Sequence, residues 1–240
     1  MTADNNQFRF REVVFFGRDI GEYVSMFDLD LGAIRGMRVL DCPAGPAAFA
    51  KQAEEIGISV VACDPMYVQE DVAILRQVVD SDAQDVTRKQ HLNRDLFHPQ
   101  LTPTSVRREA MEIFLQDYAE GRERGRYVAG QLPSLPFGDK SFDIALSANL
   151  LFLYSDTNSG GMLENSPFDL DFHRKAIREL TRVSRNEVRM YPLKGPWKGD
   201  HAFIRPLIWE LESDSFKVEF KDVAQRDIIG AEQMMIITRP

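Results

Sequence analysis

Two aspartates stand at the ends of short apolar runs, where a carboxylate can reach a ligand. Asp41 ends the run 37–41 and opens a turn of small residues, 42–47, that leads into a helical pattern. Asp64 ends the run 59–64, about twenty residues further on. Small residues let a ligand approach the backbone, and a helix start offers free N–H groups. A carboxylate at the second position can accept both hydroxyls of a ribose, so the spacing predicts a nucleoside-binding site.

Such a site needs parallel strands whose carboxyl ends meet at one sheet edge. The runs 37–41 and 59–64, joined by a helix with Phe49, Ala53 and Ile56 on one face, predict a βαβ unit. Further strands are expected at 126–129, 142–147 and 187–191, and an antiparallel hairpin at 216–223 and 232–238. We therefore predict an α/β fold: a Rossmann-like doubly wound sheet of about seven strands, with the last hairpin strand antiparallel.

The chain is interpreted as one domain, 1–240, with an N-terminal helical cap at about 1–35. The region of about 66–125 shows only helical patterns, at 68–79 and 106–118. An ordinary connection between strand and helix takes about 2–6 residues, so this region is a helical insertion. It either covers one end of the sheet as a lid or packs on a sheet face, and the sequence does not separate the two.

Composition narrows the function classes. The 240 residues carry a net charge of -8, which disfavours binding to a phosphate backbone, so no nucleic-acid partner is expected. Two cysteines and no Cys/His cluster predict no metal site. The apolar stretch 144–154 is too short for a membrane span, and no signal peptide is evident, so we expect no membrane partner and a cytoplasmic location. Oligomeric state is left open.

From the two aspartates alone, NAD and S-adenosylmethionine (SAM) fit equally well. The segment 130–143 separates them, because it contains Leu135-Pro136-Phe137, Gly138-Asp139 and then Ser141-Phe142-Asp143 before a strand. With the Asp41 turn, Asp64 and the helix 173–183, it resembles the class I SAM-dependent methyltransferases over about residues 36–193. That resemblance implies the class I methyltransferase fold, SAM as cofactor, S-adenosylhomocysteine as product, and a small or medium-sized acceptor.

The resemblance also implies site residues. Asp41, Cys42, Pro43, Ala44 and Gly45 would lie against the methionine part of SAM, and Asp64 against its ribose. Its adenine would contact Pro65, Met66, Gln131 and Leu132, and its methyl group Ser147, Ala148 and Asn149. Arg18 would meet the SAM carboxylate, and Tyr23, at the mouth of the site, is a catalytic candidate. His201, in the loop after the fifth strand, is expected to face the acceptor and is the better candidate for a base than His173.

The sequence departs from the family pattern in its loop and in its adenine contact. Only Gly45 remains of the usual loop glycines, and Pro43 lacks a backbone donor. Gln131 stands where an acidic residue is common, and its carbonyl oxygen can still accept a hydrogen bond from adenine.

Structural roles compete with these assignments. Asp64 followed by Pro65 fits a helix N-cap, and Asp41 could order its own turn. Arg18 could be solvated and Tyr23 half-buried, while Cys42 fits a small buried thiol.

Other functions also stay open. One alternative is a non-catalytic protein of the same fold that binds SAM or a nucleotide; an NAD-dependent oxidoreductase shares the early motif only. Enzymes that methylate amino groups of nucleic acids are disfavoured, because Ser147-Ala148-Asn149-Leu150 stands where they carry an Asn-Pro-Pro-Tyr type of motif.

Overall fold

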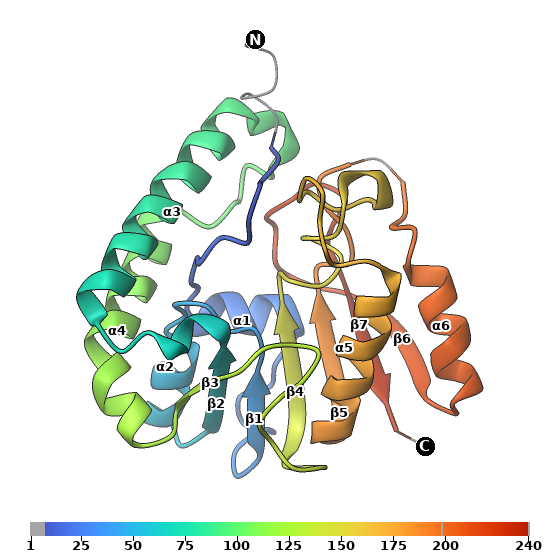
Figure 1. The fold of residues 1–240 in the computed structure, drawn as a ribbon, viewed down its shortest axis with the longest axis horizontal. Helices are drawn as coiled ribbons and strands as arrows, with labels where there is room; N and C mark the ends of the chain where they lie inside the picture. Colours follow the sequence, from blue (N-terminus) through green and yellow to red (C-terminus); the bar gives the residue numbers. More distant parts are fainter. Residues whose placement is uncertain (1–7, 198, 240) are drawn as a thin grey trace.

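The computed structural model describes residues 8–197 and 199–239, and its centre is a seven-stranded sheet (Figure 1). Along the sheet the strands are ordered β3-β2-β1-β4-β5-β7-β6. Neighbours from β3 to β5 pair in parallel, whereas β7 pairs antiparallel with both β5 and β6. The predicted doubly wound sheet with an antiparallel hairpin strand is confirmed. The strands are β1 (Arg38–Asp41), β2 (Ser59–Asp64), β3 (Tyr127–Ala129), β4 (Phe142–Ala148), β5 (Ser184–Tyr191), β6 (Lys217–Asp222) and β7 (Gln233–Thr238).

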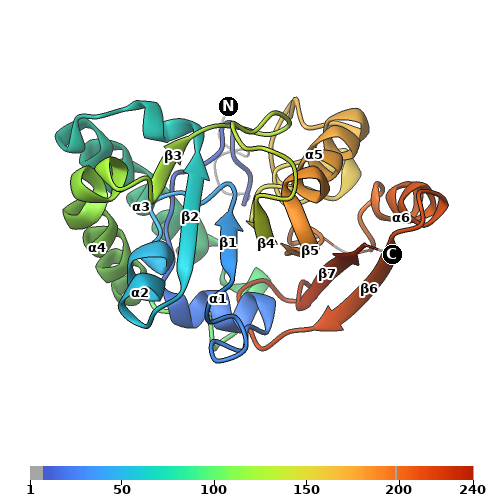
Figure 2. The same cartoon turned by 90° about the horizontal axis from the view of Figure 1, so that it is seen from below.

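Helices cover both sheet faces, because successive strand residues point to opposite sides and both sides are apolar (Figure 2). In β1, Val39 packs in the core beneath the first four helices, whereas Leu40 packs in the core beneath the last two. The helices are α1 (Ile20–Phe27), α2 (Phe49–Glu55), α3 (Val72–Leu92), α4 (Thr104–Glu123), α5 (Leu170–Val183) and α6 (Ile204–Ser213). Short 3-10 helices are η2 (Pro65–Val68), η3 (Arg94–Leu96) and η4 (Thr157–Ser159).

The region 66–125 contains α3 and α4, which lie side by side, with η2 and η3. Leu75 and Val79 of α3 pack into the same core as Phe114 of α4. Beyond that contact α3 continues past the carboxyl ends of the strands (Figure 1). Part of the insertion therefore packs beside the sheet, and part stands above its edge.

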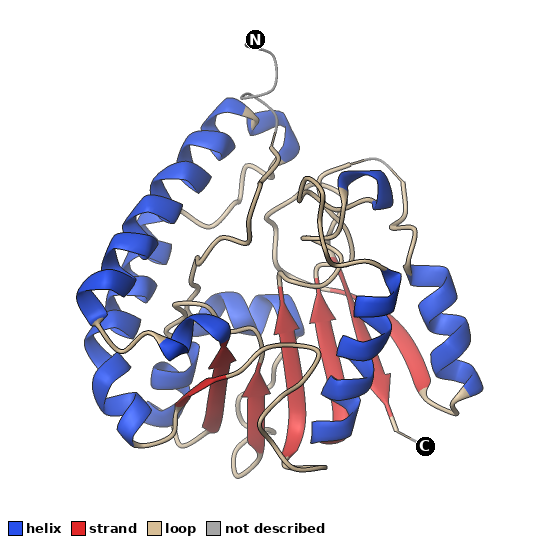
Figure 3. Cartoon of the chain, in the orientation of Figure 1, coloured by secondary structure: helices blue, strands red, loops and turns tan. Residues whose placement is uncertain are grey.

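Much of the chain above the strand ends is loop (Figure 3). The segment 8–19, called the strap below, crosses between α3 and the loop that follows β4. Backbone hydrogen bonds hold it at both ends: Phe10 N–H donates to Met162, and Ala48 N–H donates to Arg18. A Cβ on Gly17 would lie 1.9 Å from the Pro46 carbonyl oxygen, so only glycine permits this crossing over the β1 loop.

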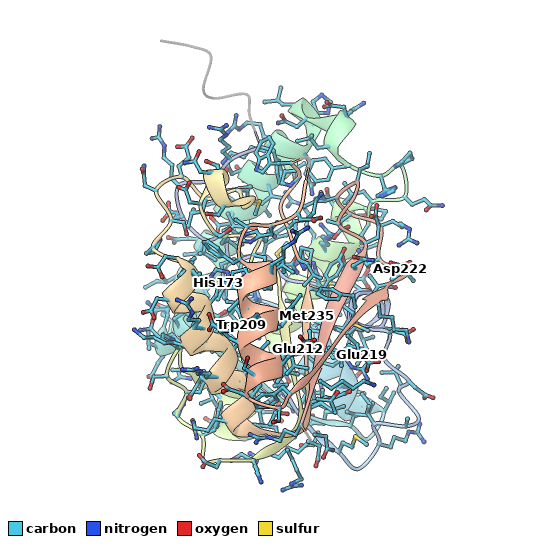
Figure 4. The ribbon with its side chains drawn as sticks, turned by 90° about the vertical axis from the view of Figure 1, so that its right-hand side faces the viewer. His173, Trp209, Glu212, Glu219, Asp222 and Met235 are labelled. Atoms are coloured by element: carbon cyan, nitrogen blue, oxygen red, sulfur yellow. The ribbon has the colours of Figure 1, made fainter. Side chains whose placement is uncertain are left out.

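The structure differs from the sequence prediction in the N-terminal cap and at one edge of the sheet. Of the helical cap expected at about 1–35, only α1 is helical among the described residues, and 8–19 forms the strap instead. α6, which the sequence analysis did not include, packs beside β6; Pro206 in its first turn is compatible with a helix start. Trp209 of α6 is 72% exposed, and Glu219 and Asp222 lie along the edge strand β6 (Figure 4). Charged residues on an edge strand disfavour pairing with another sheet.

Candidate active site

A cavity of about 720 Å³ opens at the carboxyl ends of β1, β2 and β4. Its floor is the β1 loop and the ends of these strands, and the strap, α3 and the loop after β4 surround it. Most of the predicted cofactor residues line it. These are Arg18, Cys42, Pro43, Ala44, Gly45, Asp64, Pro65, Met66, Gln131, Leu132, Ala148 and Asn149, together with Tyr23.

Asp64 lies at the end of β2 and joins the two loops of the floor. Its Oδ1 accepts a hydrogen bond from Met66 N–H and its Oδ2 accepts one from Gly45 N–H, both 2.9 Å long. The first bond makes Asp64 the N-cap of η2. Each carboxylate oxygen has a second lone pair, so the capping role leaves acceptors for a ligand. Burial raises the pKa of Asp64 to about 6.

Beside it, the ionisable side chains of Arg18 and Tyr23 line the cavity, and the fully buried Asp41 lies directly behind Tyr23. The Tyr23 hydroxyl donates to Asp41 Oδ2 over 2.7 Å, while Asp41 Oδ1 is buried with no hydrogen-bond partner among the described residues. Nε of Arg18 is likewise buried and unpartnered in that part of the chain. Burial raises the pKa of Asp41 to about 8, although the Tyr23 hydrogen bond opposes this. One acidic and one basic group here lack part of their hydrogen bonding.

A buried ion cluster, which the sequence analysis did not identify, supports this floor. Arg107 Nε donates to Glu22 Oε1 over 2.9 Å, and its Nη2 donates to both oxygens of Asp227 over 2.7 and 2.8 Å. Glu22 Oε1 also lies 3.8 Å from Arg18 Nε. Burial disfavours the charge on Asp227, yet Arg107 and Arg18 hold its pKa below the ordinary value.

The three members of this cluster come from α1, α4 and the link between β6 and β7. From the sequence, only the four-residue spacing of Arg18 and Glu22 indicates a contact. The partners of Arg107 could not be predicted in this way, because they are 85 and 120 residues away in the chain.

Three predicted residues are not in the cavity lining. Asp41 reaches it through Tyr23, and Ser147 is buried in β4. His201 is also buried: its Nε2 lies 2.5 Å from Ser155 Oγ, and its Nδ1 accepts from Phe203 N–H. Burial, and then the neighbouring His173, lower the pKa of His201 to about 4. This geometry corrects the expectation that His201 faces the acceptor, and it favours a packing role.

Replacing His201 with Ala is therefore expected to destabilise the fold by about 1–3 kcal/mol, because Ser155 and the Phe203 N–H would lose a buried partner. Urea unfolding measures this. SAM affinity should be unchanged at temperatures where the variant is folded. A variant with parental stability but lost turnover would restore His201 as a candidate base.

Within 8–197 and 199–239, His, Cys, Asp and Glu side chains nowhere form a group of three or more that could hold a metal ion. No helix in the same residues combines the length and apolarity needed to cross a membrane.

No protein-family model matches the chain. An uncharacterized protein of Methanocaldococcus jannaschii is 23% identical over 235 residues, which cover 95% of this chain and 97% of that protein. Among solved structures, a TehB-like SAM-dependent methyltransferase from Corynebacterium glutamicum is 15% identical with a TM-score of 0.45, covering 88% of this chain and 84% of the other. Magnesium protoporphyrin IX methyltransferase from Synechocystis with bound SAM is 11% identical with a TM-score of 0.44, covering 87% and 73%.

The assignment of the fold rests on the sheet itself, in which β1 lies between β2 and β4 and the hairpin strand β7 is inserted antiparallel between β5 and β6. The chain has the class I methyltransferase fold. In this fold the cavity occupies the edge where ligands of open α/β sheets bind, beyond the carboxyl ends of the strands.

Proposed function

We propose that this protein is a SAM-dependent methyltransferase acting on a small or medium-sized molecule. The observation that carries the proposal lies at the floor of the cavity: Arg18 Nε, of a lining residue, and Asp41 Oδ1, directly behind Tyr23, are both buried without a hydrogen-bond partner among the described residues. An acidic and a basic side chain that each have one atom without a hydrogen bond fit the two ends of a zwitterion: an α-amino group and an α-carboxylate. Asp64 supplies ribose acceptors at the neighbouring strand end.

In this proposal Arg18 holds the carboxylate of SAM, Asp41 its ammonium group and Asp64 its ribose. Met66, Gln131 and Leu132 line the cavity on the side of β2 and β3 and would hold adenine, as the family resemblance implies. When bound, SAM supplies an electrophilic methyl group on a sulfonium. The residues of the chain orient the two reactants and exclude water, which can provide much of the acceleration of a methyl transfer.

Tyr23 takes a positioning role. Burial, and then the charge of Asp41, raise the pKa of Tyr23 well above its ordinary value, so its hydroxyl stays protonated and donates to Asp41. Tyr23 therefore fixes the Asp41 carboxyl for the ligand and is a poor proton acceptor. This role replaces the expectation that Tyr23 is catalytic at the mouth of the site.

Thermal shift with three ligands tests the proposal. SAM and S-adenosylhomocysteine should raise the melting temperature and NAD should not; at about 100 times the dissociation constant the stabilisation is roughly 2.7 kcal/mol. Stabilisation by NAD alone would favour the oxidoreductase. Binding of SAM without transfer to any acceptor would favour the non-catalytic alternative.

Ligand binding should release protons near neutral pH. The pKa of Asp41 is raised to about 8, so its carboxyl is mostly protonated at pH ~7, and an ammonium group bound there would require the ionised form. Calorimetry of S-adenosylhomocysteine binding in buffers of different ionisation enthalpy should therefore show release of most of one proton. Asp41→Asn should abolish the release. Equal heats in all buffers for the parent would contradict the placement of the ammonium group at Asp41.

The insertion and the loop after β4 are proposed to close over the bound ligands. The motivating observation is that α3 and the loop 149–168 both border the cavity above the sheet. Segments 66–125 and 155–168 should then be cleaved by protease in the free protein and protected with SAM and acceptor, because closing segments have low local stability. Equal cleavage under both conditions would leave these segments a purely structural role.

A further inference from the structure

The part of the cavity away from the floor differs in chemistry from the proposed SAM site. We call it the acceptor end; it lies between the strap, α3 and the loop after β4. Its apolar surface is mainly aromatic, and edge-to-face contacts fix part of it: Phe8 packs on Phe97 at 4.8 Å between ring centroids. From the other side, Leu153, Phe168 and Phe172 line the same space. Such walls bind the apolar body of a ligand, and apolar rings most readily.

The polar groups at the acceptor end come mainly from one face of α3. Gln77, Ser81, Asp82 and Gln90 line the cavity at helical spacing. Asp82 is half-buried, and its Oδ2 accepts a 2.6 Å hydrogen bond from Phe15 N–H of the strap. That bond fixes the carboxylate and leaves Oδ1 as an acceptor with no hydrogen-bond partner among the described residues.

Charge at the acceptor end is one-sided. Glu12 of the strap lines the cavity together with Asp82, whose pKa is raised first by burial and also by Glu12. The nearby Lys89 ammonium is engaged elsewhere, because it pairs with Asp85 at 2.8 Å and lies 3.9 Å from the centroid of the Phe10 ring. The arginines that line the cavity belong to the floor, where Arg107 pairs with Glu22 and Asp227, and Arg18 would hold the carboxylate of SAM. A ligand anion would therefore meet the carboxylates of Glu12 and Asp82, and none of the described basic side chains lines this end of the cavity.

We propose that the methyl acceptor is a hydrophobic, ring-bearing molecule whose polar group is an amine or alcohol that donates a hydrogen bond to Asp82, and that organic acids are rejected. This inference rests on the proposed function, because it takes the floor of the cavity to be filled by SAM. Asp82 acts here as a specificity residue, which binds the acceptor through Oδ1 while Phe15 N–H holds its orientation.

Three probes with the same apolar body test the proposal: phenylbutylamine, phenylbutanol and phenylbutyrate. Each is titrated by calorimetry into full-length protein saturated with S-adenosylhomocysteine, so binding is measured without turnover. We expect the amine to bind at least ~10-fold more tightly than the carboxylate, with the alcohol between them, because opposite and like charges near a half-buried carboxylate differ by that much or more. Asp82→Asn should reduce the ratio of amine to carboxylate affinity to about one third or less of its parental value.

Asp80→Asn is the matched control, since Asp80 is an exposed aspartate of the same helix outside the cavity lining and its replacement changes the net charge equally. It should leave the ratio unchanged. The proposal is overturned if phenylbutyrate binds as tightly as the amine, if Asp82→Asn leaves the ratio unaltered, or if no probe binds while S-adenosylhomocysteine does. Failure of S-adenosylhomocysteine itself to bind would instead count against the proposed function, so the two failures are distinguishable.

Discussion

Asp64→Ala should weaken the binding of SAM and S-adenosylhomocysteine by about two powers of ten or more. Hydrogen bonds to a charged acceptor contribute roughly 1.5–3 kcal/mol each, and 1.4 kcal/mol corresponds to a factor of ten. The variant also removes the partner of Gly45 N–H, which loosens the loop that would contact the methionine part. Asp64→Asn should lose less affinity, because its amide oxygen can still accept one bond. Isothermal calorimetry measures both variants.

The matched control is Asp71→Ala. Asp71 is the N-cap of α3, where its Oδ1 accepts from Ala73 N–H just as Asp64 accepts from Met66 N–H, but it is exposed and outside the cavity lining. Asp71→Ala should cost about 1 kcal/mol of stability through the lost cap, and Asp64→Ala should cost more because it also leaves Gly45 N–H without its partner. Only Asp64→Ala should lose affinity. If Asp64→Ala bound S-adenosylhomocysteine as tightly as the parent, Asp64 would be a cap alone.

Arg107→Ala should lower the free energy of unfolding by about 3–5 kcal/mol, because removing one member of a buried ion cluster leaves the others uncompensated. Arg107 is 3% exposed, and its loss would strand Glu22 and Asp227 in the interior. Urea denaturation measures the change. The shared contact of Glu22 with Arg18 further implies weaker binding of S-adenosylhomocysteine by the folded variant.

Arg76→Ala is the comparison for this second substitution. Arg76 also makes two hydrogen bonds to one carboxylate, Glu112, but both side chains are more than 40% exposed. An exposed pair contributes only about 0–1 kcal/mol, so the two arginines should differ severalfold in effect. Similar losses of stability in both variants would mean that burial of the Arg107 cluster has no special energetic weight.

The sequence predicted the sheet well because each strand carries its own signal. The mainly apolar run 59–64 lies between Gly57 and Pro65, and it forms β2 over the predicted residues, Ser59–Asp64. The β1 loop and Asp64 could be predicted as site residues because each follows a strand that is evident in the sequence. The carboxyl ends of parallel strands meet at one edge of the sheet, so these residues were expected to lie close together. Gln131 and Leu132, which the resemblance assigns to adenine, line the same cavity.

What the sequence did not reveal depends on contacts between distant residues. Arg107 lies within a helical pattern, and nothing in that pattern indicates that Glu22 and Asp227 would surround it. His201 stands in a loop of glycines and charges that suggests exposure, yet Ser155 and the aromatic rings of Phe152 and Phe203 enclose it. Side-chain burial of this kind is fixed only by the tertiary fold.

The strap has a consequence for the order in which the protein matures on the ribosome. Its partners Asp82, Tyr154 and Met162 are all translated much later than the strap itself. Contacts between residues far apart in sequence form slowly, because a long loop must close before they contribute. The strap residues that line the cavity therefore leave the ribosome first but reach their final positions late. A nascent chain released before Met162 would lack the partner that holds Phe10, so ligand-binding competence should be acquired only late in synthesis.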